Sequence, residues 1–318
     1  MSMETRILGS GGPSVGAVGL GCMPMNWGYG GETSESEAFR AIHRAIDLGV
    51  TLLDTADVYG PYANEDLVGR ALEGRRDEVV LATKVGLVVG PSGGYPLAND
   101  GRPEHVRSAI DASLRRLRTD VIDLYQLHRI DPAVPLEETW GAMVGSVQAG
   151  KVRALGLSEP NIEELERARA IHPVASVQSE LSLWTRDHLA DVVPWCAANG
   201  VAFIPFAPLG RGFLTGAITA ASFDDDDFRA KNSRFSQESI DANLTIVERI
   251  RAVADRHDAT PAQIAIAWTL AQGPHVIPIP GTRRMRFVEE NAAAADIRLT
   301  DQDLSELAAL PEAAGSRY

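Results

Sequence analysis

The chain has 318 residues, of which 45% are hydrophobic, and a formal net charge of −13. This composition supports a large buried core and excludes a disordered chain. The negative charge argues against nucleic acid or an anionic membrane surface as the main partner. Two cysteines, Cys22 and Cys196, lie far apart in the sequence and form no disulfide or metal framework, which fits a reducing compartment.

The first segment, RILGSGGPSVGAVGLGC (residues 6–22), has a Gly-Gly-Pro turn between two short apolar stretches and predicts a β-hairpin. The opening residues do not resemble a signal peptide, and no apolar run approaches the roughly 18 residues of a membrane helix. We therefore expect a cytoplasmic protein without a membrane segment.

Short apolar runs then alternate with helical patterns. Strands are expected at Val18–Gly21, Thr51–Asp54, Val79–Thr83, Val121–Leu127, Ala154–Leu157, Ala175–Val177, Ala202–Phe206 and Val276–Ile279. Helices are expected at Ser36–Leu48, from Pro103, after an Asn161 cap, from Thr185, and from Thr260 and Pro261. Long loops are expected over residues 91–103 and from Gly210 to about Ser239, the latter with a mobile acidic run, Asp224–Asp227.

Repeated strand–helix units with short connections predict a parallel sheet with right-handed crossovers. Eight units favour closure into a (β/α)8 TIM barrel, an α/β fold, with residues 1–318 forming a single domain. A doubly wound open sheet is the alternative. If it bound a dinucleotide, it would usually carry a G-x-G-x-x-G turn after its first strand, and the sequence has none in register.

Four ionisable residues lie at or just after the ends of predicted strands: Asp54, Tyr59, Lys84 and His128. Each alone has an ordinary structural explanation, as a cap, a packed ring, an ion pair or a core histidine. Together they would meet at the mouth of a barrel, where they could exchange a proton with a carbonyl oxygen. Lys84 beside Tyr59 would lower the phenol's pKa by a few units, Asp54 would hold Lys84, and His128 would orient the substrate oxygen.

Several motifs occur in a specific order: DTADVYG, NEDLVGRAL, ATKVG, DLYQLHRIDP, KVRALGLSE and PIPGTRRMRFVEENAAA. With them the chain resembles the aldo-keto reductases over nearly its whole length, in particular a bacterial and plant subgroup with the HRIDP segment. The resemblance implies a barrel whose bottom is closed by the N-terminal hairpin. It also implies that Asp54, Tyr59, Lys84 and His128 are the family's catalytic tetrad. A monomer or a small homo-oligomer is expected.

The resemblance further implies NADPH or NADP⁺ as cofactor, with NADH possible. In this family, Ser158 and Gln178 would contact the carboxamide, Phe206 would stack on the nicotinamide, and other residues would hold the phosphates and adenine. The full set is Met23, Asp54, Ser158, Gln178, Phe206, Pro208, Leu209, Gly210, Arg211, Gly281, Thr282, Arg283, Glu290 and Asn291. Glu159 replaces the Asn that many members carry after the serine, which leaves the carboxamide contact open. Phe287 replaces an Arg that supports the 2′-phosphate in many members, which leaves NADP versus NAD open.

Independently of the family, Arg283, Arg284 and Arg286 form a basic cluster suited to phosphate. Met25, Trp27 and Tyr29 are candidates for the wall of a substrate pocket. No metal site is expected, because no histidine or cysteine accompanies the acidic run at ligand spacing.

The main hypothesis is an NAD(P)H-dependent reductase that converts a small aldehyde or ketone to an alcohol, with Tyr59 as the general acid. One alternative is a regulatory subunit that senses nicotinamide nucleotides with little turnover. Another is a barrel lyase or isomerase, suggested by the fold alone. The sequence does not identify the substrate.

Overall fold

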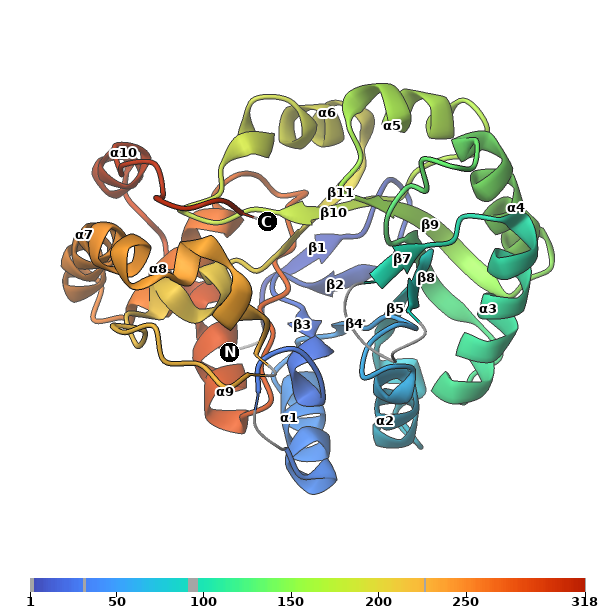
Figure 1. Cartoon of the computed structure of the whole chain (residues 1–318), viewed down its shortest axis with the longest axis horizontal. Helices are drawn as coiled ribbons and strands as arrows, with labels where there is room; N and C mark the ends of the chain where they lie inside the picture. Colours follow the sequence, from blue (N-terminus) through green and yellow to red (C-terminus); the bar gives the residue numbers. More distant parts are fainter. Residues whose placement is uncertain (1–2, 31–32, 91–96, 226, 318) are drawn as a thin grey trace.

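The computed structural model describes residues 3–30, 33–90, 97–225 and 227–317. A parallel sheet of seven strands forms its centre, in the order β11-β10-β9-β8-β5-β4-β3, and helices surround this sheet (Figure 1). The strands are β3 (Leu20–Gly21), β4 (Leu52–Asp54), β5 (Val80–Val85), β8 (Ile122–Leu127), β9 (Val152–Ser158), β10 (Ser176–Glu180) and β11 (Ala202–Phe206). This arrangement confirms the predicted parallel α/β barrel.

The eighth predicted strand, Val276–Ile279, is not a regular strand, although it occupies the expected place between β11 and β3. Ile277 N donates to Phe203 O at 2.8 Å, and Gly19 N donates to Pro278 O at 2.9 Å. Pro278 and Pro280 have no N–H to donate, so a continuous ladder cannot form. The segment closes the ring through isolated bonds, of which one pairs Phe203 with Val276 and another pairs Gly21 with Gly281.

The N-terminal hairpin closes the bottom of the barrel, as predicted. It pairs β1 (Thr5–Ile7) with β2 (Ser14–Gly16) in antiparallel register. The adjoining Leu8 and the β2 residue Val15 are buried in one apolar cluster with the barrel residues Leu52, Leu124 and Ile277. The hairpin therefore excludes water from the end of the barrel opposite the mouth.

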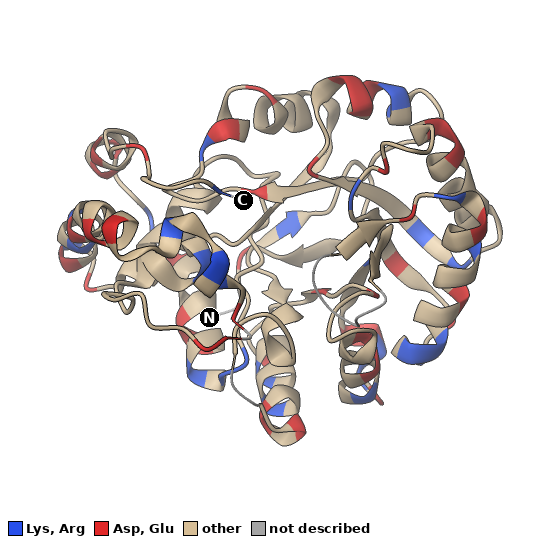
Figure 2. Cartoon of the chain, viewed as in Figure 1, with Lys and Arg blue, Asp and Glu red and all other residues tan. Residues whose placement is uncertain are grey.

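The helices are α1 (Glu35–Asp47), α2 (Ala63–Ala71), α3 (Pro103–Leu117), α4 (Leu136–Gln148), α5 (Ile162–Arg169), α6 (Val192–Asn199), α7 (Gln237–Arg256), α8 (Pro261–Leu270), α9 (Met285–Ala293) and α10 (Asp301–Ala308). Ser34, Asn161 and Thr260 form capping boxes at the starts of α1, α5 and α8. Most of the charged residues lie on the outer helices (Figure 2). In the described part of the chain, no helix is long and apolar enough to cross a membrane.

The predicted start of the helix at Thr185 was wrong. A short 3-10 helix, η3 (Asp187–Leu189), comes first, and α6 begins only at Val192. Pro194 explains the delay, because its ring would clash with the carbonyl group of residue 190 if the helix began a turn earlier. Thr185 instead closes a tight turn with Ser182.

The two long predicted loops contain more structure than expected. In the first, β6 (Leu87–Val89) pairs with β7 (Leu97–Asn99), while residues 91–96 lie outside the described residues. In the second, three short 3-10 helices follow one another: η4 (Gly210–Thr215), η5 (Phe228–Lys231) and η6 (Ser233–Phe235). The prediction of a mobile acidic run was wrong for Asp227, which is only 3% exposed and pairs with Arg229 at 2.6 Å. Asp226 lies outside the described residues.

Candidate active site

The parallel strands bring the four ionisable residues of the sequence prediction to one mouth. Asp54 ends β4, Lys84 lies near the end of β5, and His128 directly follows β8. Tyr59 lies in the turn between β4 and α2. Since neighbouring parallel strands point the same way, side chains at their carboxyl ends converge.

Lys84 is fully buried beneath this mouth, and its ammonium group has three close acceptors. Its Nζ lies 2.5 Å from Asp54 Oδ2, 2.8 Å from Thr55 O and 3.3 Å from Tyr59 Oη. Burial lowers the pKa of Lys84, but Asp54 and Tyr59 outweigh burial and hold that pKa above its usual range. The residue therefore stays cationic.

Asp54 is held on its other oxygen by two glutamines. Oδ1 accepts hydrogen bonds from Gln178 Nε2 at 2.8 Å and from Gln126 Nε2 at 3.2 Å. The sequence analysis missed Gln126. Its position in β8, two residues before His128, was the available signal, because residues i and i+2 of a strand share a face. Gln178 was predicted to contact a cofactor. It also holds the Asp54 carboxylate in place, and this carboxylate in turn holds Lys84.

The predicted lowering of the Tyr59 pKa was wrong. Burial raises the pKa of this phenol by more than Lys84 lowers it, so the pKa lies above 10.0. Tyr59 therefore keeps its proton at neutral pH. Because Lys84 donates to the phenol oxygen, the phenol's own proton remains available for a ligand.

His128 stands edge-on to Tyr59, with ring centroids 5.7 Å apart. Burial, together with the positive charges of Lys84 and Arg129, holds the pKa of His128 well below its usual range, so the ring is neutral. Its Nδ1 is buried and has no hydrogen-bond partner within the described ranges. A neutral imidazole in the tautomer protonated at Nε2 can donate one hydrogen bond from that atom.

Tyr59 and His128 line a cavity of about 1140 Å³. Most of the predicted cofactor residues line it too: Met23, Asp54, Ser158, Gln178, Phe206, Pro208, Leu209, Arg211, Gly281, Thr282, Arg283, Glu290 and Asn291. The cavity contains an aromatic ring, amide and hydroxyl groups, and arginines. This set of groups fits a dinucleotide with an aromatic end and phosphates.

Among the predicted cofactor and substrate-pocket residues, Met25 and Gly210 do not line this cavity. Met25 is fully buried in the main hydrophobic core, so its prediction as a pocket wall was wrong, whereas Trp27 does line the cavity. Met25 ends the 3-10 helix η1 (Met23–Met25), which turns Met23 and Met25 in different directions. Gly210 packs against Trp184, where an added Cβ would meet the indole ring at 2.7 Å.

The basic cluster predicted from the sequence lines the cavity beside Phe287. The guanidinium carbon of Arg286 lies 4.4 Å from the Phe287 ring centroid, and that of Arg284 lies 5.9 Å from it. Arg283 donates to Gly30 O at 2.9 Å. Phe287 therefore provides a surface for two guanidinium groups through cation–π contact.

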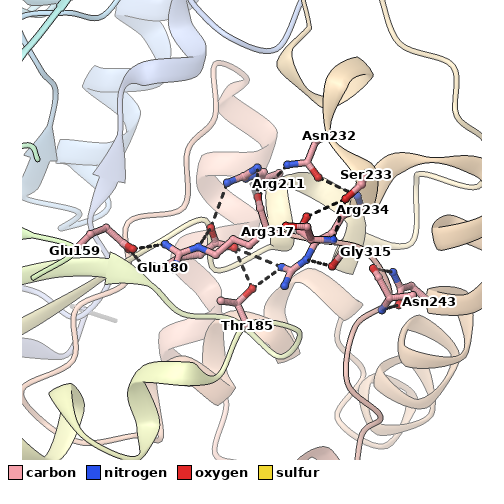
Figure 3. Close-up of polar contacts among 12 residues, drawn as sticks. Glu159, Glu180, Thr185, Arg211, Asn232, Ser233, Arg234, Asn243, Gly315 and Arg317 are labelled. Atoms are coloured by element: carbon pink, nitrogen blue, oxygen red, sulfur yellow. Dashed lines mark hydrogen bonds and ion pairs between the residues drawn. The ribbon is translucent and has the colours of Figure 1, made fainter. Parts of the chain in front are cut away.

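Glu180, at the end of β10, is the centre of a second charged cluster (Figure 3). It is 1% exposed, and three arginines contact its carboxylate: Arg317 at 3.0 Å, Arg211 at 3.2 Å and Arg234 at 3.8 Å. Thr185 Oγ1 also donates to it at 3.0 Å. A buried carboxylate with this many donors is compensated for the loss of water.

Arg317 also lies 2.5 Å from Glu159, and its guanidinium is 5.9 Å from the Phe206 ring centroid. The segment before it is tied to α7 and η6 through Asn243–Ala314 and Ser233–Ser316 hydrogen bonds (Figure 3). Glu159 is thereby turned toward Arg317 and the backbone N–H of Glu180. The sequence analysis missed this cluster, since no local pattern links residues so far apart in the chain.

We expect Glu180→Gln to lower the free energy of unfolding by about 3 kcal/mol, because it leaves three arginines facing one another without their buried anion. Urea denaturation measures this loss. Glu137→Gln is the matched control, since Glu137 and Arg167 form an exposed pair whose loss should change the stability little. Equal losses in the two variants would contradict a structural role for the buried cluster.

The chain is similar to known proteins over nearly its whole length. The model of the aldo/keto reductase family matches residues 17–312. A probable aldo-keto reductase 1 from Glycine max is 42% identical over 316 residues, which cover 98% of this chain and 90% of that protein.

Two solved structures share the fold over nearly their full length. A glycerol dehydrogenase from Gluconobacter oxydans has a TM-score of 0.86 and 31% identity, covering 97% of this chain and 95% of the other. The holo form of an aldo-keto reductase from Bacillus halodurans has a TM-score of 0.79 and 26% identity, covering 99% of this chain and 98% of the other.

Proposed function

Because this chain belongs to the aldo/keto reductase family, we propose that it catalyses the reversible, NADPH-dependent reduction of an aldehyde or ketone to an alcohol. One observation carries the proposal: Lys84 Nζ lies 3.3 Å from Tyr59 Oη, and Tyr59 shares a cavity wall with His128. A proton donor with a buried cation behind it suits the stabilisation of a developing alkoxide.

Each residue of the tetrad has a separate role in this proposal. Tyr59 donates its proton to the carbonyl oxygen, and His128 donates a hydrogen bond that orients the same oxygen. Lys84 stabilises the phenolate left behind, and Asp54 holds Lys84 in place through the 2.5 Å ion pair. When bound, NADPH supplies the hydride that the carbonyl carbon receives.

Ser158, Gln178 and Phe206 would hold the nicotinamide end of the cofactor, since all three line the cavity and Gln178 contacts Asp54. Leu209 and Arg211 would lie along the pyrophosphate. Arg283, with Gly281 and Thr282, would hold the 2′-phosphate, and Glu290 and Asn291 would contact the adenine. The positive charge of the arginine cluster supports NADP over NAD.

We expect Arg283→Met and Arg284→Met each to weaken NADPH binding by about 10- to 100-fold, because a charge-assisted bond to phosphate is lost. NADH lacks that phosphate, so its affinity should stay nearly constant. Fluorescence titration with the two nucleotides side by side measures both affinities. If NADPH and NADH lost affinity equally, the cluster would not recognise the 2′-phosphate.

Steady-state oxidation of NADPH with a panel of aldehydes and ketones tests the function directly. Glyceraldehyde belongs in the panel, because one relative is a glycerol dehydrogenase. Turnover of at least one carbonyl compound is expected. Tight NADPH binding without turnover of any would favour a nucleotide-sensing subunit, and activity without nucleotide would favour a lyase or isomerase.

A further inference from the structure

Arg129 directly follows His128 and lines the same cavity as His128 and Tyr59. It is half-buried, and its Nη1 donates to His128 O at 2.6 Å and to Ser158 Oγ at 3.0 Å. Both hydrogen bonds of the side chain within the described residues use this one nitrogen. Nε and Nη2 therefore keep N–H groups for a ligand in the cavity.

Arg129 has no acidic partner. In the part of the chain that the structure describes, no carboxylate oxygen lies within 4.0 Å of its guanidinium. Two other arginines on the cavity wall do have such partners: Arg211 pairs with Glu180, and Arg229 pairs with Asp227. A half-buried guanidinium without a counterion is costly unless an anion from outside approaches it.

This unpaired charge acts on the reacting groups themselves. Arg129 contributes to the low pKa of His128, and it partly offsets the effect of burial on the pKa of Tyr59. Trp27, Leu87 and Leu97 line the same cavity and pack in one apolar cluster with Tyr59. A substrate whose carbonyl oxygen lies between Tyr59 and His128 would therefore present its neighbouring atoms to one cation and several apolar side chains.

Resting on the proposed function, we propose that Arg129 forms an anion-binding subsite that selects carbonyl substrates with a carboxylate close to the carbonyl group. The substrate class is that of oxo acids and aldehydic acids with an apolar or aromatic body. The planar guanidinium can hold a carboxylate through two parallel hydrogen bonds, a geometry that a lysine ammonium does not reproduce. The apolar walls would hold the body of the substrate.

Three carboxybenzaldehydes and their methyl esters test the proposal, because each acid and its ester differ in charge but little in shape. The 2-, 3- and 4-isomers vary the distance between carboxylate and carbonyl. The quantity compared is the ratio of kcat/KM for the acid to kcat/KM for its ester. Any change in the proton donor affects both members of a pair and cancels in the ratio.

For at least one isomer, we expect the unmodified protein to prefer the acid. Arg129→Met should lower that ratio by about 10- to 100-fold, the loss expected for a charge-assisted hydrogen-bond pair. Arg129→Lys should give an intermediate ratio. Arg153→Met is the matched control, because it removes the same charge from an exposed position on β9 and should leave the ratio unchanged.

An unchanged ratio in Arg129→Met would overturn the proposal, even if both rates fell. Arg129 would then serve only to position His128 and Ser158.

If the unmodified protein reduced neither acid nor ester, the proposed function would fail. Calorimetric titration with benzoate would then test the anion-binding subsite by itself. We expect benzoate affinity to fall at least tenfold in Arg129→Met; equal affinity in the two proteins would overturn the subsite.

Discussion

Replacing Tyr59 with phenylalanine is expected to lower kcat for carbonyl reduction by about 10²- to 10⁴-fold, the usual contribution of a positioned general acid. The substitution removes one hydroxyl group, and the ring can keep its packing against Trp27 and His128. NADPH binding should survive, because the predicted cofactor contacts lie on other residues. Stopped-flow or steady-state loss of NADPH absorbance measures the rate, and fluorescence titration measures the binding.

Tyr62→Phe is the matched control, since Tyr62 loses the same hydroxyl group but is partly exposed and stacks on Arg116, away from the tetrad. Its turnover should equal that of the unmodified protein. Turnover retained by Tyr59→Phe would refute the assignment of the proton donor.

The same variant tests the direction of the Tyr59 pKa. Burial raises this pKa above 10.0 and outweighs Lys84, so the phenol should remain protonated through neutral and mildly alkaline pH. The difference between ultraviolet titrations of the unmodified protein and Tyr59→Phe isolates this one tyrosine. Its ionisation should appear only above about pH 10. A transition below that pH would mean that Lys84 outweighs burial.

Lys84→Met is expected to abolish measurable reduction and to lower the free energy of unfolding by about 3–5 kcal/mol. The change leaves the Asp54 carboxylate buried without its cation and removes the positive charge behind Tyr59. Urea denaturation and NADPH-linked assays measure the two effects. Lys151→Met is the control, because Lys151 pairs with Asp111 near the surface and should cost less than about 1 kcal/mol.

The double variant Asp54→Asn with Lys84→Met should be less destabilised than the sum of the two single variants, since neither charge is then left alone.

The effect of Lys84 on stability depends on pH with a definite sign. The pKa of Lys84 is raised above 10.5, so its contribution to stability is complete below that pH and is lost only as pH rises through the higher folded-state pKa. The free energy of unfolding that Lys84→Met loses relative to the unmodified protein should therefore be the same at about pH 7 and pH 9. A loss below about 1 kcal/mol in Lys84→Met would contradict a stabilising role for the buried pair.

Much of this site could be predicted from local sequence pattern. Apolar runs ending in Asp54, Lys84 and His128 marked the strand ends, and parallel strands necessarily place such ends together. The capping boxes at Asn161 and Thr260 required only residues three positions apart. The region of the eighth strand was correct as well, although its prolines keep it from forming a regular ladder.

Other features depended on distances that no local pattern contains. The pKa of Tyr59 reflects a balance between burial and one ammonium group 3.3 Å away, and the balance went against the prediction. Met25 turned into the core because a 3-10 helix follows β3. The absence of an acid beside Arg129 could be judged only after the described neighbours had been placed in space.

The sequence by itself determined where the strands lie along the chain, and hence that Asp54, Lys84 and His128 meet at the mouth of the barrel. Strand and cap patterns act over a few neighbouring residues, so they can be read in one dimension. Only the tertiary structure decided how deeply each group is buried and which charges are paired, as for Glu180 with Arg317. Those properties arise because closing the ring removes water and brings distant segments together, and the free energy of a charge depends on both.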